Sequence, residues 1–285
     1  MSNIKAYSIR DLLSRIENRD YFRFPKLLHG FWDRLDFFSY GKYDINCVVN
    51  NIRNFGENFG DKIYSEPLVN MQFFEERGTV GIGLHYIEII ELLAKSNPNV
   101  LWGISDTNFH GDSQKSRSSN LRKISKKWID LTVKTNMVDG CFWKDLVSSG
   151  EFVRFLNAIE KFAVVVIGMK HLAELNDVFC FQDFHFIEVE MPLAPRLQQF
   201  QKELEKFQAK LCRPAVYMSQ MSIDGVPLIC KADLSETFFF DVGRGLDAFS
   251  KISIEREWEE TIPASLRTMY KNECFRKKLR SQMLL

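Results

Sequence analysis

The sequence has 285 residues, of which 45% are hydrophobic and 26% are charged, a balance typical of a folded globular protein. Lysine and arginine total 38 against 37 aspartate and glutamate residues, so the net charge of +1 gives no overall field toward nucleic acid or an anionic membrane. Any site for a polyanion must therefore be local. Six widely spaced cysteines, a polar amino terminus and the lack of a long apolar run predict a soluble cytoplasmic protein without a membrane partner.

The first half of the chain alternates between short apolar runs and helical periodicity. Apolar side chains at helical spacing follow Ser8, which predicts an amphipathic helix with Ser8 as its N-cap. Residues 21–28 predict a strand, residues 43–55 a helix that Asp44 can cap, and residues 100–104 another strand. A short β-like run at residues 79–83 precedes a further helical pattern that ends near residue 94.

The second half has a clearer pattern. Residues 151–162 predict a helix, residues 163–167 a buried strand that ends at Gly168, and residue 171 the start of another helix. A long helix is predicted at residues 192–211, and three more strands at residues 184–189, 214–219 and 237–242. This alternation predicts an α/β fold with a mostly parallel, Rossmann-like sheet and helices on both faces. We expect one domain, residues 1–285, with residues 141–150 as a soft boundary between two halves.

Two strand ends are candidate anion sites. The apolar strand that ends at Gly168 and leads into a helix can present backbone N–H groups to a phosphate, although a plain turn also needs glycine there. Asp241, Gly243 and Arg244 follow the last predicted strand. Asp241 can hold a ribose hydroxyl and Arg244 a phosphate, or the two can pair with each other while Asp241 caps the next helix.

The long polar loop at residues 105–119 contains Asp106, His110 and Asp112. A histidine between two carboxylates can act as a general base near neutral pH. The same side chains can bind a divalent cation, or they can serve only the turns of the loop. The sequence therefore leaves metal dependence open.

Basic residues without an acidic neighbour follow this loop, and they are Lys115, Arg117, Arg122, Lys123, Lys126 and Lys127. Such a cluster can contact nucleic-acid phosphates or simply form a solvated surface. At residues 26–32, Lys-Leu-Leu-His-Gly-Phe-Trp, we predict a strand that ends in a His29-Gly30 turn, with two aromatic residues that anchor the turn to the core.

In the order of these segments, the chain resembles the GT-D type of nucleotide-sugar glycosyltransferase over about residues 8–250. Residues 26–31 fall where that family has a strand ending in Arg-Phe-Gly-Asp-Gly-Glu, and residues 38–44 where it has an aromatic-Gln-x-Tyr-Asp segment. Residues 103–106, Gly-Ile-Ser-Asp, match its Gly-Ile-Pro-Asp, and residues 164–168 its apolar strand ending in Gly. The acidic pair of Asp-Gly-Glu is replaced here by His29-Gly30-Phe31.

The resemblance implies a transferase that moves a hexose from a nucleotide-sugar to an acceptor hydroxyl. The Phe- and Asn-rich composition and the basic cluster also resemble phage enzymes that glucosylate DNA, which implies UDP-glucose as donor, modified double-stranded DNA as acceptor and the host cytoplasm as location. The implied donor-binding residues are Lys26, His29, Gly30, Gly168, Asp241, Gly243 and Arg244. Lys26 and His29 would replace a metal at the leaving diphosphate, and Asp106 or His110 would be the catalytic base.

Two other functions are compatible with the same residues. One is a glycosyltransferase of surface polysaccharide synthesis, for which the basic cluster would be dispensable. The other is a non-catalytic module that binds a nucleotide or DNA, which would bind ligand without turnover.

Overall fold

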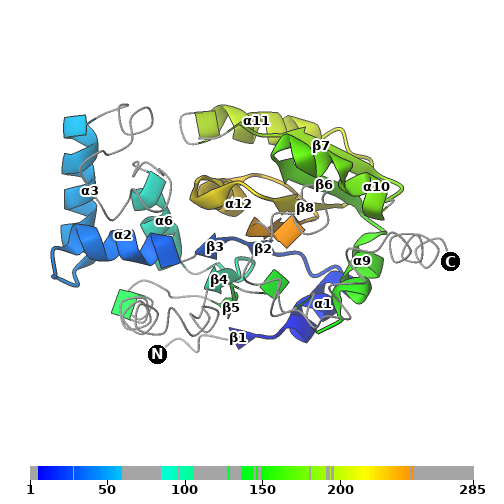
Figure 1. The fold of residues 1–285 in the computed structure, drawn as a ribbon, viewed down its shortest axis with the longest axis horizontal. Helices are drawn as coiled ribbons and strands as arrows, with labels where there is room; N and C mark the ends of the chain where they lie inside the picture. Colours follow the sequence, from blue (N-terminus) through cyan, green and yellow to red (C-terminus); the bar gives the residue numbers. More distant parts are fainter. Residues whose placement is uncertain are drawn as a thin grey trace.

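The computed structural model describes the chain in segments, which cover residues 6–27, 29–59, 85–95, 97–104, 127–128, 136–140, 142–143, 146, 149–179, 181–190, 193, 196–243 and 245–246. Every strand pair in these segments is parallel, and helices pack on the sheets, so the predicted α/β fold with a mostly parallel sheet is confirmed (Figure 1). No helix in the described part of the chain is long and apolar enough to cross a membrane. Residues 79–83 and 105–119 lie outside the described residues.

The larger sheet has five strands in the order β2-β9-β8-β6-β7. Its strands are β2 (Arg23–Phe24), β6 (Ala163–Gly168), β7 (Phe184–Glu188), β8 (Ala215–Ser219) and β9 (Thr237–Asp241). The four strands predicted in the second half of the chain are therefore confirmed to within one residue at each end. All residues of β6, β8 and β9 are buried, as expected for strands that are covered on both faces.

The smaller sheet has four strands in the order β1-β5-β4-β3. They are β1 (Ala6–Tyr7), β3 (Lys26–Leu27), β4 (Trp102–Ile104) and β5 (Met137–Asp139). The strand predicted at residues 21–28 is split at Pro25, since β2 belongs to the larger sheet and β3 to the smaller one. Pro25 has no N–H group to donate to a ladder, so the pairing changes partner at this residue. The two sheets meet at this segment.

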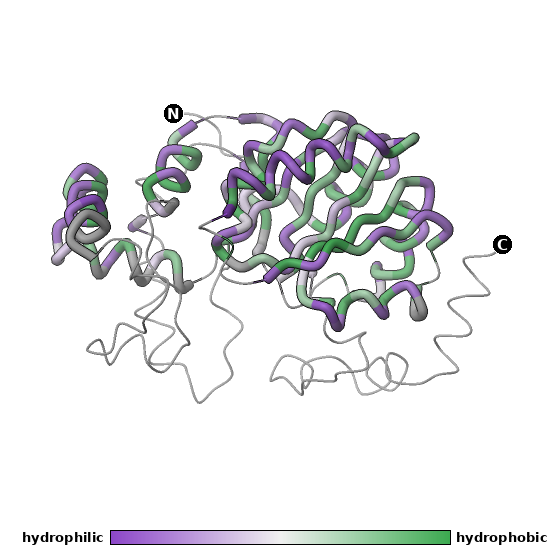
Figure 2. The backbone as a smooth tube through the Cα atoms, turned by 90° about the horizontal axis from the view of Figure 1, so that it is seen from above, coloured by the Kyte–Doolittle hydropathy of each residue, from purple (hydrophilic) through white to green (hydrophobic). Residues whose placement is uncertain are grey.

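The side chains of the larger sheet alternate between two hydrophobic cores. Val164 and Phe240 face α1 (Ile9–Glu17), α9 (Phe152–Ile159) and α10 (Leu175–Phe179). Val165 and Phe239 face α11 (Leu197–Gln208) and α12 (Gly225–Lys231) on the other side. Figure 2 shows hydrophobic and hydrophilic residues alternating along the covering helices, as expected for helices with one buried face.

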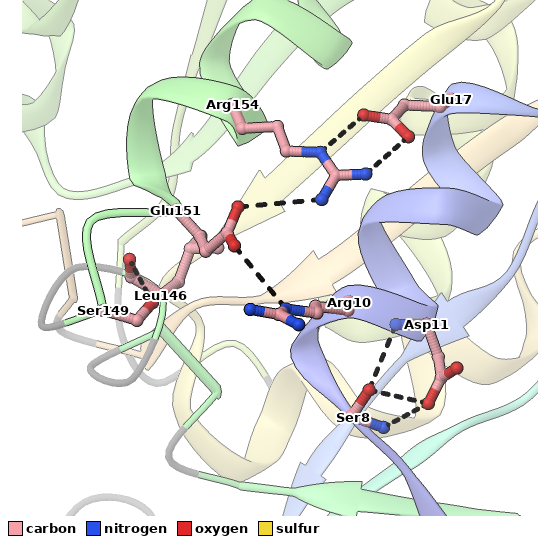
Figure 3. Close-up of polar contacts among 8 residues, drawn as sticks. All are labelled: Ser8, Arg10, Asp11, Glu17, Leu146, Ser149, Glu151 and Arg154. Atoms are coloured by element: carbon pink, nitrogen blue, oxygen red, sulfur yellow. Dashed lines mark hydrogen bonds and ion pairs between the residues drawn. The ribbon is translucent and has the colours of Figure 1, made fainter.

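Polar contacts fix α1 beside α9 (Figure 3). The Ser8 hydroxyl accepts a hydrogen bond from the Asp11 amide, and the Asp11 carboxylate accepts one from the Ser8 amide at 2.8 Å, so the predicted N-cap is confirmed as a capping box. Arg154 of α9 donates to both carboxylate oxygens of Glu17, each at 2.8 Å. This bidentate pair joins the first helix to the second half of the chain.

Helices α2 (His29–Ser39), α3 (Ile45–Phe59) and α6 (His85–Ala94) form a third core beside the smaller sheet. The His29-Gly30 turn predicted at residues 26–32 is wrong, because α2 begins at His29 itself. The aromatic residues of this segment are buried on one face of α2, together with Leu35 and Phe38. The spacing of these buried residues is that of a helix, but the strand pattern just before them favoured a turn in the sequence interpretation. Lys231 of α12 pairs with Glu88 of α6 and so joins this core to the larger sheet.

Three other helical predictions need correction. The segment after Gly168 forms a five-residue 3₁₀ helix, η2 (Lys170–Glu174), and becomes α-helical only at α10. Helix α11 is shorter than the predicted helix at residues 192–211. Helix α12 was not predicted because Gly225 and Pro227 are breakers in most contexts, although both are tolerated in the first turn of a helix.

Candidate functional site

The carboxyl ends of the strands converge where the two sheets meet. In the larger sheet, Ser219 at the end of β8 lies between Ile167 of β6 and Asp241 of β9. Because β2 pairs with the other side of β9, Asp241 lies beside the chain segment that leads to Lys26. Open parallel sheets bind ligands beyond the carboxyl ends of their strands, at points where the topology changes. This edge is therefore the candidate site.

Asp241 is a buried acid at the end of β9, with 6% of its surface exposed. Its Oδ1 atom accepts a hydrogen bond from the Gly243 amide at 2.9 Å, and the backbone amide of Lys26 also hydrogen-bonds the carboxylate. Burial raises the pKa of the Asp241 carboxyl from 3.8 to about 6, while the positive charge of Lys26 and the two amide hydrogen bonds oppose this rise. The group therefore changes its charge close to neutral pH.

Lys26 reaches the same point from the smaller sheet. Its Nζ atom lies 3.3 Å from the position that a Cβ atom would take on Gly243. Gly243 has a φ of +52°, a backbone conformation that favours glycine. A side chain at position 243 would therefore be strained and would press on the ammonium group. The structure brings together three residues that the sequence had predicted separately as donor-binding: Lys26, Asp241 and Gly243.

Gly168 ends β6 at the same edge, but its surroundings are apolar. A Cβ atom at this position would lie 2.7 Å from Cδ1 of Leu172 and 3.3 Å from Cβ of Gln220. This close approach is by itself a packing reason for glycine at position 168. Because η2 follows instead of a long helix, no helix N-terminus is available here for a phosphate. A donor-binding role for Gly168 remains a prediction.

His29 and Gly30 are the first two residues of α2, directly beyond the carboxyl end of β3. The first backbone N–H groups of a helix have no partner within the helix, so those of α2 are donors at the edge that holds Lys26. Sequence reasoning missed this feature, and the helical spacing of the buried aromatic residues was the signal that would have revealed it. The side chains of His29 and Gly30 lie outside the described residues, so their donor-binding role stays a prediction.

The described residues at the end of β3 do not reproduce the acidic pair of Asp-Gly-Glu. Phe31, at the position of the acidic residue that closes the family's Asp-Gly-Glu, is 2% exposed and stacks on Tyr86 with ring centroids 5.6 Å apart. No cluster of three or more metal-ligating side chains occurs among the described residues. The Lys26 ammonium group supplies a positive charge at this edge, beside Gly243.

Several predicted site residues lie outside the described residues, and they are Asp106, His110, Arg244, Lys115, Arg117, Arg122, Lys123 and Lys126. Of the basic cluster, Lys127 is described, and it is exposed. Its Nζ atom lies 4.0 Å from the centroid of the Tyr43 ring, and that ring lies 5.3 Å from the ring of Trp128. Lys127 thus lies beside the segment that leads into α3.

No family model and no curated protein match the sequence. Among solved structures, the fold is similar to one described as a new glycosyltransferase from Streptococcus sanguinis with a domain of unknown function 1792, at 11% identity and a TM-score of 0.55 over 85% of this chain and 82% of that one. A second structure of that domain, described as a distinct glycosyltransferase fold, gives 12% identity and a TM-score of 0.50 over 85% of this chain and 79% of that one. The chain therefore has this type of glycosyltransferase fold, which confirms the fold that the GT-D resemblance implies.

Proposed function

We propose that the protein is a glycosyltransferase that transfers glucose from UDP-glucose to a hydroxyl group of a sugar on glucosylated hydroxymethylcytosine DNA. This is the reaction of the beta-glucosyl-hydroxymethylcytosine alpha-glucosyltransferases of T-even phages. The observation that carries the transferase proposal is the cluster of Lys26, Asp241 and Gly243 at the carboxyl edge of a sheet with a glycosyltransferase fold.

Lys26 is suited to the diphosphate of the donor. The ammonium group can pair with phosphate oxygens, and the N–H groups at the start of α2 lie at the same edge. When the bond between the anomeric carbon and the diphosphate oxygen breaks, negative charge develops on UDP. A fixed cation stabilises that charge more in the transition state than in the ground state. His29, Gly30, Gly168 and Arg244 complete the proposed donor site.

The acceptor requires a base and a surface. Asp106 or His110 would remove the proton from the acceptor hydroxyl, whose oxygen forms the new bond to the anomeric carbon as UDP leaves. The segment from Lys115 to Lys127 would contact DNA phosphates and position the acceptor without reading its sequence. The exposed position of Lys127 is compatible with this role.

The activity test is the release of UDP from UDP-glucose with no acceptor, unmodified DNA, glucosylated hydroxymethylcytosine DNA or a free saccharide. Release that depends on glucosylated DNA supports the full proposal. Release only with a saccharide would point to polysaccharide synthesis instead. Binding of UDP-glucose with no release under any condition would identify a non-catalytic module.

The DNA surface is tested by the triple variant Lys123→Ala, Lys126→Ala, Lys127→Ala. Each lost phosphate contact should lower the salt dependence of DNA binding by about one unit of slope, with little change in preference among sequences. Binding to duplex DNA is measured by fluorescence anisotropy at several salt concentrations. A triple variant with the wild-type slope would exclude this segment from the DNA surface.

A further inference from the structure

The Asp241 carboxylate hydrogen-bonds backbone amides of the protein itself, whereas an ordinary ligand-binding acid points at the ligand. Its carboxylate accepts hydrogen bonds from the amides of Gly243, at 2.9 Å, and Lys26, which belong to opposite ends of the sequence. The side chain is almost fully enclosed, with 6% of its surface exposed. Asp241 thus joins the segment that contains Lys26 to the segment that contains Gly243, and the Lys26 ammonium group lies beside Gly243.

The charges around Asp241 are few. Among the described residues, Lys26 is the charged side chain that acts on its ionisation. The neighbouring residue on β8, Ser219, is neutral, and its hydroxyl donates to the Phe240 carbonyl at 3.2 Å. With Asp241 ionised, the pair of Lys26 and Asp241 has no net charge. With Asp241 protonated, the same pair carries one positive charge beside the proposed diphosphate site.

We infer that Asp241 is a positioning residue for Lys26, and that binding of the donor diphosphate is coupled to the uptake of a proton by Asp241. The inference rests on the proposed donor site. A diphosphate next to Lys26 brings negative charge toward a buried carboxylate, and like charges disfavour its ionised form. The proton comes from solvent and binds one carboxyl oxygen, while the other oxygen can still accept a backbone hydrogen bond.

The direction of the pH dependence follows from the free protein. The pKa of free Asp241 is about 6, so at pH 7 the group is mostly ionised and must gain a proton when the donor binds. Well below pH 6 it is already protonated, and no uptake remains. Donor affinity should therefore weaken above pH 6, by at most tenfold per pH unit for a single proton, and level off at lower pH.

The test is isothermal titration calorimetry of the full chain with UDP-glucose at pH 7, without acceptor, in buffers of different ionisation enthalpy. UDP-glucose is chosen over UDP because both of its phosphates are esterified, so the ligand has no phosphate proton that titrates near pH 6. The dependence of the heat on buffer ionisation enthalpy gives the number of protons bound. We expect an uptake of up to one proton at pH 7 that disappears at pH 5.

Two variants locate the proton. Asp241→Asn should lose the proton uptake that Asp241 provides, and its affinity for UDP-glucose should depend less on pH than that of the wild type. Asp183→Asn is the matched control, because Asp183 is a partly buried carboxylate that pairs with Arg213 and His185 at the opposite edge of the same sheet, and it should retain the wild-type uptake. Uptake that survives in Asp241→Asn would assign the proton to another group.

The wild-type titrations can overturn the inference even if Asp241→Asn fails to fold. UDP-glucose binding with the same heat in every buffer at pH 7 would overturn the coupling and leave the proposed function intact. A complete lack of UDP-glucose binding would overturn the proposed donor site and the coupling together.

Discussion

The amino and carboxyl edges of the five-stranded sheet use charged residues in different ways. At the amino edge, Arg23 donates to the Thr237 hydroxyl at 2.7 Å and to the Leu234 carbonyl at 2.6 Å, where β9 begins. Asp183 lies between Arg213 and His185, with 2.7 Å to each. These contacts join segments at the amino ends of the strands, Arg23 of β2 to the start of β9, and Asp183 before β7 to Arg213 before β8. At the carboxyl edge, the charges of Asp241 and Lys26 instead flank a glycine.

The surface is hollowed at the opposite, amino edge of the sheet. A hollow of about 360 Å³ opens at the amino edge, lined by polar residues that include Glu205, Arg213 and Asp233. The Glu205 carboxylate there already accepts hydrogen bonds from Gln201 and from the Asp233 amide. Acids with such partners stabilise the fold. The carboxyl edge is the better functional candidate because burial raises the pKa of its acid, Asp241, and the positive charge of Lys26 lies close enough to act on it.

The largest expected effect is a loss of kcat when a charge is removed at the carboxyl edge but not when one is removed at the amino edge. Lys26→Met should lower kcat for UDP-glucose by about 10²- to 10³-fold, the loss seen when one fixed charge-stabilising group is removed. Lys161→Met is the control, since the Lys161 ammonium group donates to the Glu17 carbonyl before β6 begins, and its kcat should stay near the wild type. Initial rates of UDP release and circular dichroism measure activity and fold. Equal losses in both variants would contradict the assignment.

At the amino edge, Arg23→Met should lower stability and not activity. This substitution should lower the free energy of unfolding by about 2–4 kcal/mol, because buried groups lose hydrogen bonds to a charged partner. Burial lowers the pKa of Arg23 to about 10. This value is still well above neutral pH, so the guanidinium is charged and donates these hydrogen bonds. Urea unfolding measures the loss. A large fall in kcat per folded molecule would show that this edge also serves catalysis.

Asp241 should make stability depend on pH. Its pKa is raised in the folded state, so the folded protein binds the proton more tightly than the unfolded chain does. The contribution of this group is therefore most favourable below pH 4 and is lost as the pH rises from about 4 to about 6, by about 3 kcal/mol. Asp241→Asn should remove this difference when urea unfolding of both proteins is compared at pH 4.5, 6 and 7.5. If the free energies of unfolding of the two proteins changed with pH in parallel, the pKa of Asp241 would not be raised in the folded state.

The smallest expected effect concerns Gly168. Gly168→Ala should lower the free energy of unfolding by about 1–2 kcal/mol, because the new methyl group forces Leu172 aside. If packing is the reason for glycine here, KM for UDP-glucose should not change. A KM that rises several-fold with little loss of stability would instead place Gly168 in the donor site.

The sequence by itself determined most of the regular elements. The continuous apolar runs of β6, β8 and β9 predict buried parallel strands, and Ser8 with Asp11 predicts the start of α1, because propensity, periodicity and capping act over a few residues. The main failure was α2, where His29-Gly30 after an apolar strand favoured a turn. Burial of Phe31 and Trp32 against α6 and β4 decided for a helix.

Only the tertiary structure decided how the site is assembled. Lys26 and Asp241 were each predicted to bind the donor, but their contact depends on β2 pairing with β9 and on the change of sheet at Pro25. Nothing local to either residue encodes that pairing, because strand order results from packing of the whole chain. The same packing raises the pKa of Asp241, since burial is a property of the fold and not of the residue.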